Sequence, residues 1–269
     1  MIDPNFVFSQ SNLQTFEYCR YRFYLRYIQH LQWPAQISAS DDYQNDLEAG
    51  TFFHQLIHQH FLGFERELLL EQARNYPDAR LIGWLSVFFN SPYANLTGKL
   101  YPETAFTTQI GAHLISAKVD LLQVTDNGNI TIYDWKTSRK SPSIHHLKDR
   151  FQSKVYPLVV SKRLNNVDDQ TLIAMIYWEA NFPDKPIIFN FAETDIETIE
   201  KELLVKMNEI KSLSEKDFVL TNDIRRCNWC EFRSFCDRGV SAGALPPDTE
   251  LELSEYEQEI PEGDPQPWG

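Results

Sequence analysis

The chain has 269 residues, of which 42% are hydrophobic and 13% aromatic, which is enough to bury a core and unlike disordered proteins. Its net charge of −13 argues against nucleic-acid binding through overall charge, because phosphate recognition normally needs basic surface. The N-terminus has no signal-peptide pattern, and the longest apolar run, residues 172–178, is too short to span a bilayer. We therefore expect a cytoplasmic, globular protein without a membrane segment.

The negative charge is concentrated near the C-terminus. Residues 246–269 contain eight acidic residues and neither Lys nor Arg, which leaves 30 acidic (38 less 8) against 25 basic residues before them. We expect one nearly balanced domain over 1–245 and a flexible acidic tail over 246–269 that solubilises the chain, binds a partner or mimics phosphate. Two groups of arginines in the domain are candidate phosphate-facing patches, with solvated helix faces as the alternative: Arg20, Arg22 and Arg26, and Arg225, Arg226, Arg233 and Arg238.

The first ninety residues favour helices. The segment Ser11-Asn12-Leu13-Gln14 resembles a capping box, and apolar residues at helical spacing follow it, which predicts an amphipathic helix over 12–29 with Cys19 on its inner face. A second helix is predicted over 48–62, with His54 and His58 one turn apart, and a third over 65–89 with a break near Tyr76-Pro77.

After Pro102 the pattern changes to β-structure. Strands are predicted over 104–110, 113–124 and 129–136, and Asp126-Asn127-Gly128 between the last two is a strong hairpin signal. Further on, the pattern predicts a helix over 144–163 bent at Pro157, strands over 172–179 and 187–191, and a helix over 195–213. This order predicts an α/β domain with a mixed central sheet flanked by helices.

Two strands bring charged residues together. Asp134 and Lys136 project from the same strand face because side chains alternate. A two-residue turn would turn Asp120 to the opposite face, whereas a three-residue loop with Gly128 in the left-handed conformation pairs 125 with 129 and sets Asp120 opposite Asp134. The glycine at the third loop position favours the second register.

Paired carboxylates with a neighbouring lysine have a clear chemical use. Carboxylates hold Mg²⁺ or Mn²⁺ through oxygen, and Lys136 can offset charge that develops on a phosphate. Glu103 is a further acid upstream of the pair. The alternative is a salt-bridged surface strand, and a lone histidine such as His54 is more often packed or exposed than a ligand.

The same strands resemble the RecB-type branch of the PD-(D/E)xK nucleases. The resemblance lies in Ala117-Lys118-Val119-Asp120 and in Ile132-Tyr133-Asp134-Trp135-Lys136-Thr137, although the family more often has Gly-Arg at 117–118. Gln152 and Tyr156 match its Q-x-x-x-Y helix motif. Upstream, residues 50–54 match its histidine motif, and residues 9–28 resemble its N-terminal helix.

The resemblance implies a restriction-endonuclease-like fold and a metal-dependent DNA nuclease. It implies that Asp120 and Asp134 bind the metal, with His54 and the main-chain carbonyl of Trp135 as further ligands. Lys136 and Glu103 are then the other catalytic residues. Gln152 and Tyr156 would bind the substrate strand or a nucleobase, since a helix presents both on one face.

The four cysteines form a second constellation. Cys227, Cys230 and Cys236 have the spacing C-x2-C-x5-C, and Cys19 lies near the other end of the chain. Four thiolates suit a 4Fe-4S cluster or a structural zinc, and an aromatic shell is expected from Tyr18, Trp229, Phe232 and Phe235. The spacing resembles the iron-sulfur staple of AddB-type nucleases and of the small exonucleases of CRISPR adaptation, so a structural cluster joining the two ends is expected, with zinc as the alternative.

The sequence thus predicts a metal-dependent exonuclease for single-stranded DNA or overhangs, in CRISPR adaptation or DNA repair. Nuclease, integrase or helicase proteins are the expected partners, because the chain has no Walker-type loop of its own. Two other hypotheses stay open: a non-catalytic DNA-binding or assembly subunit with the same fold and cluster, and a zinc-stapled interaction protein.

Overall fold

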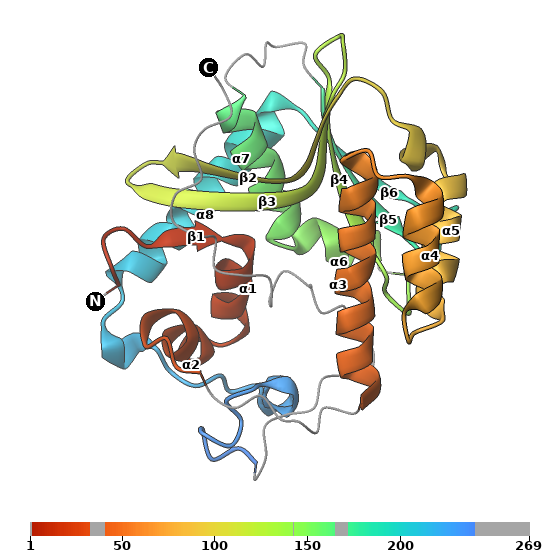
Figure 1. Cartoon of the computed structure of the whole chain (residues 1–269). Helices are drawn as coiled ribbons and strands as arrows, with labels where there is room; N and C mark the ends of the chain where they lie inside the picture. The colour runs from red at the N-terminus through yellow and green to blue at the C-terminus, as the bar shows by residue number, and fades with distance from the viewer. Residues whose placement is uncertain (1, 33–40, 142, 165–171, 240–269) are drawn as a thin grey trace.

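The computed structural model describes residues 2–32, 41–141, 143–164 and 172–239 (Figure 1). The predicted acidic tail therefore lies outside the described residues. The sheet contains the strands β1 (Val7–Ser9), β2 (Lys99–Ile110), β3 (His113–Val124), β4 (Ile130–Lys136), β5 (Ile173–Glu179) and β6 (Ile187–Phe191). The α-helices are α1 (Gln10–Tyr18), α2 (Arg20–Phe23), α3 (Asp41–Phe61), α4 (Arg66–Asn75), α5 (Arg80–Asn90), α6 (Ile144–Asp149), α7 (Gln152–Arg163) and α8 (Glu193–Ser212). Short helical segments are η1 (Tyr24–Ile28), η2 (Pro92–Asn95), η3 (Glu215–Asp217) and η4 (Ile224–Trp229).

The sheet forks along β3. Strand β2 pairs with the full length of β3, so β1 and β4 must share the other edge of β3. On that edge β1 pairs in parallel with residues 114–116, and β4 pairs antiparallel with residues 121–124. Residues 117–120 therefore lie where the two partners of β3 diverge, and this fork holds Asp120.

The β3–β4 hairpin adopts the register expected from its glycine. The pairs run from Val124 with Ile130 to Leu121 with Tyr133, and Thr125 N–H donates to the carbonyl of Asn129 at 2.9 Å. Gly128 has φ +84°, a conformation that a β-carbon disfavours. The three-residue loop is thus confirmed, and continuing its register by one residue sets Asp120 opposite Asp134.

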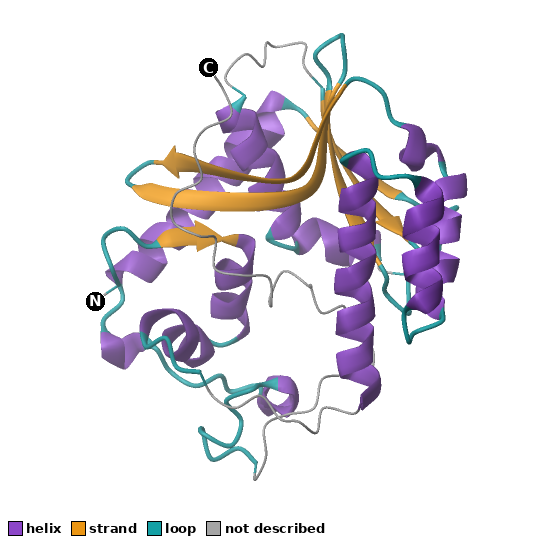
Figure 2. Ribbon diagram, in the orientation of Figure 1, coloured by secondary structure: helices purple, strands orange, loops and turns teal. Residues whose placement is uncertain are grey.

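Helices cover both faces of the sheet and enclose two cores (Figure 2). One core contains Trp135 and Trp178 from the strands and is covered by α3, α4 and α5. The other contains Ile132 and Tyr177 and is covered by α1, α7 and α8. Because Trp135 faces the first core, alternation along β4 turns Asp134 and Lys136 toward the second. The predicted mixed sheet flanked by helices is confirmed.

The N-terminal helix differs from the prediction. Its cap is Ser9, whose side chain and that of Asn12 form the capping box, so the helix begins earlier than the segment 11–14 indicated. It is also interrupted at Cys19, where the backbone is extended with φ −161° and ψ 116°. The Cys19 thiol accepts the N–H of Arg22 at 3.5 Å and caps α2. Cys19 therefore lies at a junction between two helices and is not part of the continuous helix that the periodicity suggested.

Other boundaries follow the sequence with three corrections. Helix α3 begins at Asp41, seven residues before the predicted start at 48. The predicted helix over 144–163 is two helices, and the break falls at Arg150 and Phe151, whereas Pro157 lies inside α7. Strand β2 begins at Lys99, so it includes Pro102, which is tolerated because β2 is an edge strand. The break near Tyr76-Pro77, the strands β5 and β6 and the long helix α8 agree with the predictions. None of the described helices combines the length and apolar character that crossing a membrane requires.

Candidate active site

Asp120 lies on β3 at the fork where β1 and β4 diverge. Its Oδ2 accepts the backbone N–H of Trp135 at 2.8 Å and lies 3.4 Å from Nδ1 of His54 on α3. The side chain is 13% exposed, so it is largely withdrawn from water while still open on one side. The hydrogen bond from Trp135 fixes the carboxylate at the point where the strands separate. The main-chain carbonyl of Trp135 stays a predicted ligand.

Glu103 reaches the same place from β2. Its neighbours Pro102 and Thr104 pair with Leu121 and Val119, which puts Glu103 opposite Asp120. Glu103 has φ +49°, a left-handed conformation rare for a non-glycine residue and common at functional sites. Its Oε2 is 2.8 Å from Nζ of Lys118.

His54, Glu103 and Asp120 form a candidate metal-binding group. One ligand atom from each residue lies within 4.8 Å of the other two. Two carboxylates and one imidazole suit a divalent cation, and three protein ligands leave coordination positions for water and a phosphate oxygen. The donor set therefore fits a catalytic metal. The sequence had assigned Glu103 a catalytic role without making it a ligand. It had also made Asp134 a metal ligand; Asp134 lies outside this group, and that assignment stays a prediction.

Asp134 and Lys136 form the neighbouring half of the site. Nζ of Lys136 is 2.9 Å from Asp134 Oδ2 and 3.4 Å from Gln152 Oε1, while the Gln152 amide donates to Asp134 Oδ1 at 2.5 Å. Asp134 is 2% exposed. Gln152 begins α7, so the Q-x-x-x-Y motif brings its glutamine to the carboxylate and ammonium of β4.

The carboxyl groups have divergent proton affinities. Burial raises the pKa of Asp134 to about 7, although the Lys136 ammonium opposes the shift. Burial and the charge of Asp120 raise the pKa of Glu103 to about 6. Burial also acts to raise the pKa of Asp120, but the His54 and Lys136 charges and the Trp135 N–H outweigh it, so this pKa is lowered. Asp120 is therefore ionised at neutral pH, whereas Glu103 and Asp134 gain and lose protons close to neutral pH.

Replacing Asp134 by Asn should stabilise the metal-free protein at pH 8 relative to wild type. The folded carboxyl holds its proton up to about pH 7 and the unfolded one only to about pH 4, so wild-type stability falls as pH rises through this window. We expect a gain of about 2 kcal/mol for Asp134→Asn above pH 7 that shrinks toward pH 4. Urea unfolding in EDTA at several pH values measures it, with Glu197→Gln on the exposed surface of α8 as the control. A stability difference between Asp134→Asn and wild type that does not change with pH would contradict the raised pKa of Asp134.

Two further residues near the site, Gln10 and Glu179, were not predicted from the sequence. Gln10, the first residue of α1, is buried and donates to Tyr156 Oη at 3.3 Å, which links the N-terminal helix to the second motif residue of α7. Glu179 on β5 lies opposite Lys136 in the register of the parallel strands β4 and β5, and it is 2% exposed. Glu179 could have been noticed in the sequence, because it is an acidic residue at the end of an apolar strand. The long-range contact of Gln10 produces no sequence pattern.

The four cysteines line one small pocket between α1 and the C-terminal segment. Tyr18 and Phe232 of the expected aromatic shell line it as well, whereas Phe235 is 39% exposed, and the side chain of Trp229 lies outside the described part. Burial raises the pKa of Cys230 to about 12 and that of Cys236 to about 11. Within the described ranges, no three cysteine sulfurs lie within 4.8 Å of one another. The pocket does not identify a metal, and the predicted cluster stays a prediction.

The arginine groups hold the two ends of the chain together. Nε of Arg22 is 3.0 Å from Glu231, and Arg226 donates to the carbonyls of Glu17 and Tyr18 at 2.9 Å. Arg20 pairs with Glu209 of α8 at 2.5 Å. These arginines therefore make contacts within the chain, and the phosphate-facing role of the two patches stays a prediction.

Comparison with known proteins gives a family match that covers most of the chain. Residues 7–237 match the PD-(D/E)XK nuclease superfamily, and the mixed sheet fits its restriction-endonuclease-like fold. The crystal structure of SSO0001 aligns with a TM-score of 0.34 and 16% identity, covering 84% of this chain and 93% of that one. A "Putative exonuclease" from Eubacterium rectale aligns with a TM-score of 0.48 and 11% identity, covering 78% and 83%. No curated protein matched the sequence. The match over residues 7–237 assigns this chain to the PD-(D/E)XK nuclease superfamily.

Proposed function

We propose that the protein is a metal-dependent deoxyribonuclease that hydrolyses phosphodiester bonds from the ends of single-stranded DNA or overhangs. The observation that carries the proposal is the convergence of two side-chain groups at the fork of the sheet. One is the ligand group of His54, Glu103 and Asp120, and the other is the ion pair of Asp134 and Lys136. A carboxylate-rich cation site beside a buried ammonium group suits an attack on phosphate.

Each residue of the site has a separate role in the proposed reaction. His54, Glu103 and Asp120 would hold the cation, which when bound polarises a phosphate oxygen and makes water more acidic. Lys136 lies ready to offset negative charge on the phosphoryl group, and its low exposure strengthens that interaction. Asp134, with a pKa of about 7, is suited to accept the proton of the attacking water at neutral pH. Gln152 holds both Asp134 and Lys136 in orientation.

Mn²⁺ or Mg²⁺ is the proposed cation. Carboxylate oxygens suit both ions, whereas the imidazole of His54 favours Mn²⁺ over the harder Mg²⁺. We expect both ions to support cleavage, with Mn²⁺ binding more tightly.

We further propose that the four cysteines hold a structural 4Fe-4S cluster. The proposal is supported by the C-x2-C-x5-C spacing with Cys19, which resembles the iron-sulfur staple of AddB-type nucleases, and by the four cysteines lining one pocket, with zinc as the alternative. Iron and sulfide analysis of anaerobically purified protein separates the cluster from zinc.

The resemblance to the CRISPR adaptation exonucleases and AddB-type nucleases supports a role in adaptation or repair, with nuclease, integrase or helicase partners. Residues 1–245 would form the nuclease unit and 246–269 a solubilising tail.

A cleavage assay tests the proposed activity. End-labelled single- and double-stranded DNA are incubated with wild type and Asp134→Ala, each in Mn²⁺, Mg²⁺ or EDTA. We expect wild type to shorten single strands from an end only with metal, and Asp134→Ala to be inactive. Glu197→Gln, on an exposed part of α8, controls for loss of one negative charge. DNA binding by wild type without cleavage under any metal condition would overturn the proposal in favour of a non-catalytic DNA-binding subunit.

A further inference from the structure

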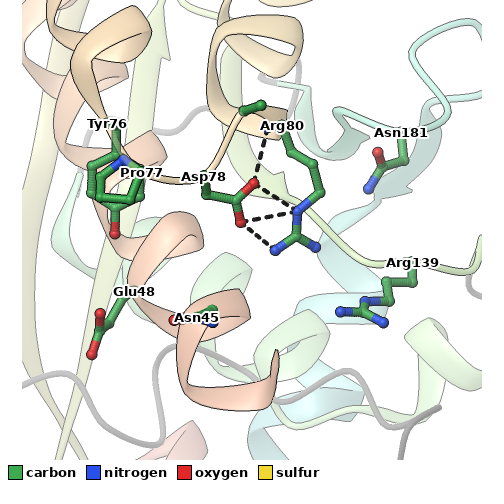
Figure 3. Close-up of a pocket in the computed structure, with 9 residues that line it drawn as sticks. Asn45, Glu48, Tyr76, Pro77, Asp78, Arg80, Arg139 and Asn181 are labelled. Carbon is green, nitrogen blue, oxygen red and sulfur yellow. Dashed lines mark hydrogen bonds and ion pairs between the residues drawn. The ribbon is translucent and has the colours of Figure 1, made fainter. Parts of the chain in front are cut away.

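A pocket of about 940 Å³ lies beside the N-terminal half of α3, outside the candidate active site. Its walls come from α3, the turn between α4 and α5, and the loop that follows β4. Figure 3 shows Arg80 and Arg139 on one side of this pocket and Tyr76 across from them. The ring of Tyr76 is stacked on Phe52 with ring centroids 4.8 Å apart. The pocket therefore combines two guanidinium groups with a supported aromatic ring, at a volume typical of small-ligand sites.

The two arginines hold one carboxylate between them. Asp46 of α3 lies 2.6 Å from Arg80 through Oδ1 and 2.7 Å from Arg139 through Oδ2. A carboxylate bound by two guanidinium groups resembles a phosphate bound by the same groups, because both anions present oxygens that match the planar N–H donors.

The arginines are held in place by other contacts. Asp78 binds Arg80 Nε at 3.0 Å, and the Arg80 guanidinium lies over the Trp84 ring, 5.2 Å from its centroid. Asn181 donates to the carbonyls of Thr137 and Ser138 at 3.1 and 2.9 Å, which fixes the loop that carries Arg139. Arg80 would thus keep its orientation if Asp46 moved away.

The pocket adjoins the active site along two elements. Arg139 follows Lys136 by three residues, and Asp46 precedes His54 by eight residues on α3. Eight residues of α-helix span about 12 Å. Adjacent phosphates of a strand lie closer together than this, so a strand whose scissile phosphate lies at the metal-binding group can reach Arg80 and Arg139 with a nucleotide about two positions away.

We propose that this pocket binds a phosphate of the DNA strand about two nucleotides from the scissile one, between Arg80 and Arg139, and that Asp46 occupies the phosphate position in the free protein. The inference rests on the proposed nuclease function and adds a subsite to it. The nucleobase of the bound nucleotide would stack on Tyr76, a contact that tolerates any base.

The exchange of Asp46 for phosphate is energetically modest. The side chains of Arg80 and Arg139 are 37% and 57% exposed, and ion pairs between exposed groups stabilise a protein only weakly. A phosphate gains two charge-assisted contacts where Asp46 loses two. Asp46 therefore competes with DNA and weakens its binding, so removing the Asp46 charge should strengthen it.

Binding of a labelled oligothymidine in EDTA tests the subsite without cleavage. Fluorescence anisotropy is measured over a range of salt concentrations for wild type, Arg139→Ala and Asp46→Asn. We expect Arg139→Ala to bind about fivefold more weakly with a salt slope smaller by about 0.7, the value for one lost phosphate contact on a single strand. Asp46→Asn should bind about threefold more tightly. The matched controls are Lys201→Ala and Glu197→Gln, the two partners of an exposed ion pair on α8.

The two variants are expected to change affinity in opposite directions, which misfolding cannot do. Equal affinity and salt slope for Arg139→Ala and Lys201→Ala would overturn the subsite, as would weaker binding by Asp46→Asn. If that happened while wild type still cut DNA with metal, only the subsite would be lost. Absence of cleavage by wild type would instead remove the proposed function.

Discussion

Replacing Asp120 by Asn should lower the affinity for Mn²⁺ by at least about 100-fold and reduce cleavage with it. Asp120 is the carboxyl group of the site whose pKa is lowered, so it supplies a full negative charge at neutral pH. The pKa of Glu103, the other carboxyl group of the metal-binding group, is raised to about 6, and Glu103 must release its proton before it binds metal. Loss of Asp120 therefore removes the charge on which the cation site depends. Titration calorimetry with Mn²⁺ measures the effect directly.

The Asp120→Asn substitution preserves the local fold for this comparison. It exchanges a carboxylate oxygen for an amide nitrogen of similar size, and the remaining amide oxygen can still accept the N–H that Trp135 donates to Asp120. Asp217→Asn on η3, where the carboxylate contacts Ser214, is the control and should bind Mn²⁺ as wild type does. Similar Mn²⁺ affinities for wild type and Asp120→Asn would show that the cation binds somewhere other than the fork of the sheet.

Replacing Lys136 by Met should lower kcat by about 1000-fold and leave Mn²⁺ binding nearly unchanged. Methionine keeps much of the side-chain length but removes the ammonium, which lies 2.9 Å from Asp134 and is not part of the metal-binding group. The loss of that cation also raises the pKa of Asp134 further, because the Lys136 charge opposes the effect of burial. Single-turnover cleavage measured against pH should therefore show a lower rate and a profile displaced to higher pH.

The displaced pH profile distinguishes this role from a structural one. Lys162→Met removes a lysine paired with Glu200 near the end of α7 and should alter neither the rate nor the profile. A Lys136→Met rate within about tenfold of wild type would show that the ammonium is not needed for the reaction.

The hairpin register could be derived from the sequence because its causes are local. The glycine at position 128 favours the three-residue loop, and the two-residue period of a strand then places Asp120, Asp134 and Lys136 on one face. The structure has that register and that glycine conformation.

The surroundings of the acids could not be derived in the same way. His54 precedes Asp120 by 66 residues (120 less 54). The family resemblance named it as a ligand, but its spacing and neighbours alone did not indicate the 3.4 Å approach to the carboxylate. Gln10 meets Tyr156 only because β1 joins β3 beside the fork and carries α1 toward α7. Arg22 and Arg226 looked available for phosphate in the sequence, but the packing of the C-terminal segment against α1 and α2 gives them partners within the chain.

The sequence by itself determined the alternating strands, the turn between β3 and β4, and which charged residues share a strand face, since short-range geometry sets all three. Only the tertiary structure decided which distant residues complete the metal-binding group, which arginines are occupied and where Arg80 and Arg139 meet. Those contacts depend on how helices pack against a forked sheet, and packing joins residues that no local pattern connects.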